Sequence, residues 1–78
     1  MKWFKTVFLP SLTENMTLNQ SRWITEKQVD VCLRYMQPDP WSPCRHYQIK
    51  VDGQWYILSV MKKGYGRLTI MQFHPNGT

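Results

Sequence analysis

The stretch HYQIKVDGQWYILSV, residues 46–60, decides the fold. Two apolar runs flank Asp52-Gly53, and Asp-Gly in this setting is a strong signal for a two-residue type I′ hairpin turn. A turn of this length sets the register, so Val51 faces Gln54 and the pairing continues outward from there. The pattern therefore predicts antiparallel strands at residues 45–51 and 54–61.

The register also assigns each side chain to one of two faces, because neighbouring residues of a strand point to opposite sides. A third strand, predicted at residues 67–73 after the turn KKGYG, adds two residues to one set and four to the other. One face is apolar, and we interpret it as the core face: Tyr47, Ile49, Val51, Tyr56, Leu58, Val60, Leu68 and Ile70. The opposite face is basic at one end and aromatic or apolar at the other: His46, Gln48, Lys50, Trp55, Ile57, Ser59, Met61, Arg67, Thr69, Met71 and Phe73.

A helix is predicted at residues 26–37. Thr25 is a good N-cap, and Gln28 stands three residues later, as in a capping box. Apolar residues then follow at helical spacing, and Pro38 ends the pattern. The apolar stripe consists of Val29, Cys32, Leu33 and Met36.

The N-terminal segment WFKTVFL, residues 3–9, is aromatic and β-branched and is followed by Pro10, which favours a first strand. Residues 11–23 are polar without a clear period and are expected to form a loop. The chain of 78 residues is read as a single domain, residues 1–78, close to the lower limit for an unaided core. The predicted class is α+β, with one α-helix packed on a small antiparallel β-sheet in the order β-α-β-β-β.

The net charge of +5 is concentrated in the second half of the chain, where Asp52 is the one acidic residue after position 39. Such a field favours an anionic partner: nucleic acid, an acidic protein surface or anionic lipid. The alternative is that the charge only keeps a small protein dissolved.

Neither catalysis nor metal binding is expected. Cys44 and His46 could share a strand face as nucleophile and base, but no third group is visible to orient them. Zinc sites use closely spaced pairs of ligands, whereas Cys32 lies in the predicted helix and His74 in a tail. We therefore expect no enzyme activity, no metal, no cofactor and no small-molecule substrate.

The expected location is cytoplasmic. The apolar run after Lys5 is too short for a signal peptide, and no segment is long enough to span a membrane. Two cysteines do not make a disulfide framework, and Cys32 is expected to be a small buried hydrophobe. No membrane partner is expected.

The candidate binding site is the basic and aromatic face together with the turn KKGYGR, residues 62–67. Lysine and arginine contact phosphate or acidic groups, and aromatic rings stack bases. The alternative is an ordinary hairpin loop whose lysines protect a sheet edge. The cationic candidates are Lys50, Lys62, Lys63 and Arg67, the stacking candidates are Trp55 and Tyr65, and Met71 and Phe73 complete the patch.

The leading hypothesis is a non-catalytic module that engages nucleic acid or a nucleic-acid-handling complex. A second hypothesis is a small inhibitor or adaptor, of the kind that bacteriophages and mobile elements encode, which binds a host protein complex through Trp55, Met71 and Phe73. Trp41, in the proline-rich connector, could join that surface but is interpreted as capping one end of the core. A third hypothesis is a homodimer that buries the aromatic face against itself.

Overall fold

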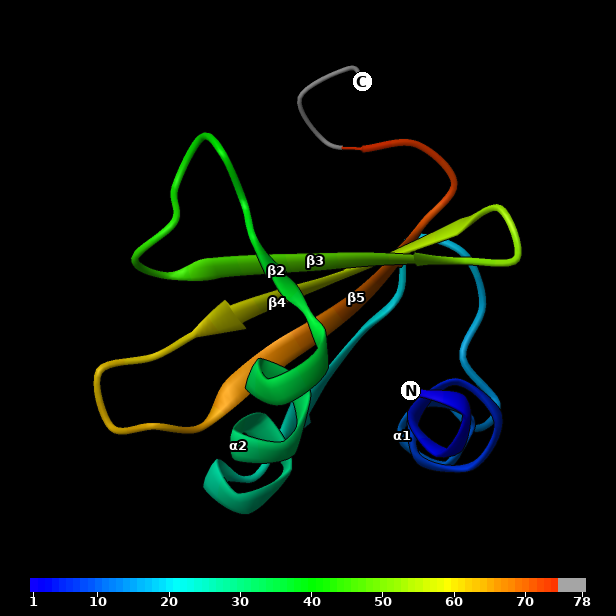
Figure 1. Ribbon diagram of the computed structural model, residues 1–78, viewed down its shortest axis with the longest axis horizontal. Coiled ribbons are helices and arrows are strands. Elements are labelled where there is room, and N and C mark those ends of the chain that lie inside the picture. Colours follow the sequence, from blue (N-terminus) through cyan, green and yellow to red (C-terminus); the bar gives the residue numbers. More distant parts are fainter. Residues whose placement is uncertain (75–78) are drawn as a thin grey trace.

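The computed structural model describes residues 1–74, which form two layers (Figure 1). One layer is a five-stranded antiparallel sheet in the order β1-β5-β4-β3-β2, and the helical segments lie together on one of its faces. The predicted α+β class is confirmed. The helical segments are η1 (Phe4–Phe8), α1 (Leu9–Leu12) and α2 (Glu26–Tyr35), and the strands are β1 (Ser21–Ile24), β2 (Gln37–Pro38), β3 (His46–Val51), β4 (Gln54–Val60) and β5 (Gly66–Met71).

The central hairpin has the predicted register. Strands β3 and β4 pair from Val51 opposite Gln54 to His46 opposite Ser59. The turn residues Asp52 and Gly53 have φ values of 51° and 79°, as a type I′ turn requires. The face assignment is confirmed too, because the predicted core residues of β3, β4 and β5 are buried or pack against the buried cluster.

Helix α2 begins at the predicted cap. The Gln28 backbone N–H donates to Thr25 Oγ1 over 3.2 Å, and the Thr25 N–H donates to Gln28 Oε1 over 2.8 Å, which completes a capping box. The helix ends at Tyr35, earlier than predicted, because Gln37 and Pro38 leave it and pair with β3 as the short strand β2. The predicted stripe is buried except for Leu33, which is 37% exposed.

The strand predicted at residues 3–9 is wrong, because this segment is helical. A helix runs from Lys2 to Leu12 through the π-helical turn η1 and then α1. Phe4, Leu9 and Leu12 project from one side of it into the core. Burial of that side outweighs the local strand preference of aromatic and β-branched residues.

The loop expected at residues 11–23 is also partly wrong, because its end forms the edge strand β1. This strand pairs with β5, with Ile24 opposite Gly66. Arg22 of β1 donates to the carbonyl oxygens of Leu12 and Glu14, over 2.9 and 2.7 Å. These hydrogen bonds tie the end of the N-terminal helix to the sheet. The expected element order therefore holds only after two corrections: a helix precedes β1, and β2 follows α2.

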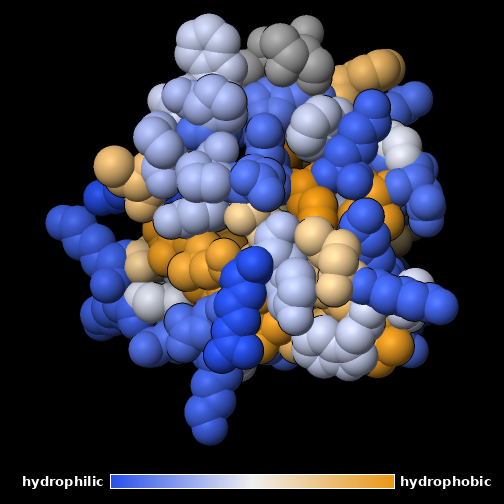
Figure 2. Space-filling view, viewed as in Figure 1, coloured by the Kyte–Doolittle hydropathy of each residue, from blue (hydrophilic) through white to orange (hydrophobic). Residues whose placement is uncertain are grey.

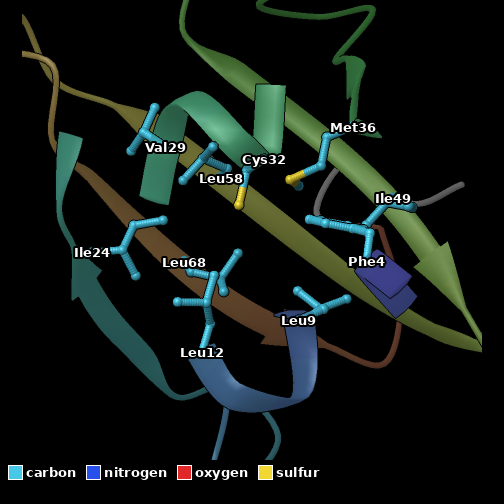
Figure 3. Packing of buried hydrophobic residues seen from close by; sticks show 10 residues of the cluster. All are labelled: Phe4, Leu9, Leu12, Ile24, Val29, Cys32, Met36, Ile49, Leu58 and Leu68. Atoms are coloured by element: carbon cyan, nitrogen blue, oxygen red, sulfur yellow. The ribbon is translucent and has the colours of Figure 1, made fainter. Parts of the chain in front are cut away.

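The core lies between the helices and the sheet (Figure 3). Cys32 is fully buried there, as predicted, and burial raises the pKa of its thiol to about 12. Gly66 lets α2 approach β5, since a Cβ at this position would lie 2.9 Å from both Leu58 Cδ1 and Val29 Cγ2. Within residues 1–74, no helix has both the length and the apolar character needed to cross a membrane. The buried cluster consists of Phe4, Leu9, Leu12, Ile24, Val29, Cys32, Met36, Ile49, Leu58 and Leu68.

Candidate nucleic-acid interface

The helices of residues 1–74 all lie on one face of the sheet, and the opposite face is called the outer face here (Figure 1). The β2–β3 loop and the segment after β5 lie on this side (Figure 1). In the space-filling view, long hydrophilic side chains surround smaller hydrophobic patches, and the surface over the β2–β3 loop is pale, neither strongly hydrophilic nor hydrophobic (Figure 2).

One end of the outer face carries an exposed tryptophan. Trp23 of β1 lies opposite Arg67 of β5, and it is 59% exposed. The guanidinium carbon of Arg67 is 5.9 Å from the Trp23 ring centroid, and the Tyr65 ring meets Trp23 edge-on at 5.5 Å. Trp23, Tyr65 and Arg67 are called the Trp23 cluster below. Sequence reasoning missed Trp23 because it assigned this residue to a loop. The available signal for a strand was the pair Trp23-Ile24, which directly precedes the cap residue Thr25.

The turn between β4 and β5 extends beyond this cluster. Lys62 and Lys63 are exposed at its tip, and Gly64 adopts a φ of 99°. The Gly64 N–H donates to the carbonyl oxygen of Met61 over 2.9 Å. The Glu26 side chain lies against the turn, since a Cβ on Gly64 would be 2.9 Å from its carboxyl carbon. One carboxylate therefore lies against the turn that carries the two predicted lysines.

An open depression of about 310 Å³ occupies the middle of the outer face. It contains hydroxyl, imidazole and guanidinium groups, all of which form hydrogen bonds. Ser21 and Thr69 face each other across β1 and β5, with their hydroxyl oxygens 2.7 Å apart. The lining residues are Ser21, His46, Ile57, Ser59, Arg67, Thr69 and Met71.

The other end of the outer face is partly covered. Trp55 lies opposite Met71 and is half-buried. The Lys50 ammonium is 5.6 Å from the Trp55 ring centroid, and the His74 ring meets Trp55 edge-on at 5.2 Å. Phe73 is 72% exposed. The predicted site residues thus form two groups, with Tyr65 and Arg67 at one end and Lys50, Trp55 and Met71 at the other.

The connector around Trp41 differs from the expectation that this side chain caps the core, because Trp41 is 69% exposed. The Trp41 backbone N–H donates to Asp39 Oδ1 over 2.8 Å. Asp39 Oδ2 lies 3.1 Å from His74 Nε2, and both side chains are buried. The buried carboxylate holds the backbone of the loop, which leaves the Trp41 side chain in solvent.

The two thiols and two imidazoles have different surroundings. Cys32 is buried in the core, Cys44 is exposed, His46 lines the depression and His74 pairs with Asp39. In the part of the chain that the structure describes, no three His, Cys, Asp or Glu side chains gather as a metal site would require.

Comparison of the chain with protein-family models, curated proteins and solved structures found no match.

Proposed function

We propose that this chain is a small, non-catalytic binding module whose outer face engages nucleic acid or a nucleoprotein complex. The arrangement of the layers supports this proposal most directly. The helices cover one face of the sheet, and the other face presents the Trp23 cluster. The β4–β5 turn, which carries the exposed Lys62 and Lys63, adjoins this cluster through Tyr65. Cations supply affinity for the phosphate backbone, and rings on an open sheet stack bases.

Four cations on or beside the outer face are available for phosphate: Lys50, Lys62, Lys63 and Arg67, all exposed. Arg22 is excluded from this set because its guanidinium is bound to carbonyl oxygens at the end of α1.

A salt titration tests the proposal. Fluorescence anisotropy would measure the affinity of the chain for single-stranded and duplex oligonucleotides between about 50 and 200 mM salt. We expect the affinity to fall steeply as salt rises, because bound lysine and arginine release counterions from the phosphates. Affinity that does not change with salt, or no binding at all, would contradict the proposal.

A pair of matched variants locates the surface. Lys62→Glu/Lys63→Glu reverses two exposed charges at the β4–β5 turn, whereas Lys2→Glu/Lys5→Glu does so on the N-terminal helix. Each substitution removes two charges, so both double variants fall from +5 to +1. We expect the turn variant to lose most of the affinity and the helix variant to lose much less. Equal losses would show that net charge, not the outer face, controls binding.

A second candidate function is a small inhibitor or adaptor that binds a protein complex. Its support is the exposure of Trp41 and Phe73, the two most exposed large hydrophobic side chains among residues 1–74. Exposed aromatic residues are common anchors of protein interfaces. Affinity capture with and without nuclease tests it, with Trp41→Ala/Phe73→Ala as the control bait. A protein retained after nuclease treatment and lost with the control bait would favour this function over the first.

A further inference from the structure

We infer that the ligand of the outer face is single-stranded nucleic acid, with one base stacked on Trp23 and the next held over the adjoining depression. This inference rests on the proposed function, since it names the form of nucleic acid that the same surface takes. Three features carry it: the presentation of the Trp23 ring, the position of the helices and the order of chemical groups along the outer face.

The Trp23 ring is both accessible and held in position. More than half of the residue is exposed, at 59%, although it lies on a paired strand. The Arg67 guanidinium carbon lies 5.9 Å from the centroid of this ring, and the centroid of the Tyr65 ring lies 5.5 Å from it. A ring that is already oriented loses little conformational freedom when a base stacks on it. Stacking on an aromatic side chain tolerates any base, because every base has a π-face.

The fold disfavours a duplex on this surface. Bases in a duplex are already stacked on one another, so a protein ring can stack only on an unpaired or displaced base. Duplex reading usually places a helix or a two-stranded ribbon in the major groove. Here α2 and the N-terminal helix lie on the opposite face of the sheet from the outer face (Figure 1), and the β3–β4 hairpin is part of a five-stranded sheet, not a two-stranded ribbon.

Groups that can bind the phosphate, the base and the sugar of a single strand follow one another from the β4–β5 turn to the depression. Lys62 and Lys63 lie at the tip of the turn and would contact phosphate. The Trp23 cluster comes next, and Arg67 belongs both to this cluster and to the wall of the depression. The hydroxyls of Ser21 and Thr69 lie in the depression, where they can bond to a base edge or a sugar.

Two comparisons test the inference. The first measures, for the unaltered chain, the affinity for a fluorescein-labelled, unstructured DNA strand of about 20 nucleotides and for its duplex. The second measures the affinity of Trp23→Phe, Trp23→Val and the control Trp41→Val for the single strand. Valine keeps the strand preference of position 23 but removes the ring, and circular dichroism would verify that each variant is folded.

We expect the single strand to bind more tightly than the duplex. Trp23→Val should weaken binding about 5-fold to 100-fold, while Trp23→Phe keeps most of the affinity and Trp41→Val keeps all of it. Tighter binding of the duplex would overturn the inference and leave the proposed function intact. The same holds if Trp23→Val binds normally, or if Trp23→Phe loses as much as Trp23→Val. Failure to bind either nucleic acid would overturn both. The comparison of strand with duplex needs no variant, so it decides the matter even if a substitution prevents folding.

Discussion

Asp39 and His74 are 35 positions apart in the sequence, yet Asp39 Oδ2 lies 3.1 Å from His74 Nε2. Each of the two residues is 3% exposed. Through this pair the segment after β5 is held against the β2–β3 loop, on the outer side of the sheet (Figure 1). The other carboxylate oxygen of Asp39 accepts the Trp41 N–H, so a single side chain organises two segments.

Removal of that carboxylate should destabilise the fold. Asp39→Ala leaves the Trp41 N–H and the His74 ring without this partner, and we expect the free energy of unfolding to fall by about 1–3 kcal/mol. Asp39→Asn keeps an acceptor and gains an N–H donor, so it should lose less. Urea denaturation of the three proteins measures the difference. Unchanged stability of Asp39→Ala would mean that the pair contributes little.

The close approach of α2 and β5 at Gly66 gives a second prediction. A Cβ here would press on Val29 Cγ2, Leu58 Cδ1 and the backbone oxygen of Ser59, at 2.9–3.0 Å. Gly66→Ala should therefore lower stability by about 1–3 kcal/mol. In a Val29→Ala background the penalty should shrink, because one of the crowding atoms is gone. A thermal-melting double-mutant cycle measures both effects, and equal penalties in the two backgrounds would contradict this explanation.

The buried thiol of Cys32 predicts a loss of stability at alkaline pH. Burial raises its pKa from 9.0 to about 12, so the unfolded chain loses this proton first. Stability should therefore be unaffected by this group below pH 9 and should fall as pH rises from 9 towards 12, by up to about 1.4 kcal/mol per pH unit.

Two alanine variants separate this effect from other titrations. Urea denaturation at several pH values above 9 should show a steeper decline for Cys44→Ala, which keeps the buried thiol, than for Cys32→Ala. Cys44 serves as the control because it is exposed. Parallel declines would show that the Cys32 thiol has no part in the alkaline response.

The carboxylate of Glu26 beside the β4–β5 turn leads to a prediction about affinity. If Lys62 and Lys63 bind phosphate, Glu26→Gln should strengthen nucleic-acid binding, because it removes a negative charge next to them. The same change should cost about 0.3–1 kcal/mol of stability, since an acidic side chain favours the first turn of α2. Glu14→Gln, an exposed residue in the loop before β1, is the matched control for net charge. Equal affinities of the two variants would argue against the turn as the phosphate-binding element.

Sequence reasoning succeeded where a signal was local. The Asp52-Gly53 turn predicted the register of β3 and β4 because a two-residue turn permits one pairing. Thr25 and Gln28 predicted the start of α2 because their hydrogen bonds close within three residues. The face assignment followed from the register. The structure confirms the predicted core face, whose residues are buried or pack against the buried cluster.

The N-terminal segment was misread because its buried residues do not follow the α-helical period. Local propensity favours a strand at residues 3–9, and Phe4, Leu9 and Leu12 reach one side of a helix through the π-helical turn η1. Only contact with the core distinguishes the two, and it selects the helix. Strand β1 and its Trp23 were missed for a different reason: residues 11–23 show no clear period, and this edge strand is defined by its pairing with β5.

By itself, then, the sequence determined the hairpin register, the helix cap and the division of the sheet into a core face and an outer face. Each of these depends on residues within one turn or one hairpin. The tertiary structure alone decided that β5 takes β1 as its neighbour, that both helices cover the same face, and that His74 reaches Asp39. Those relationships join segments far apart in the chain, and their energy comes from burial and hydrogen bonds that form only when the whole domain has folded.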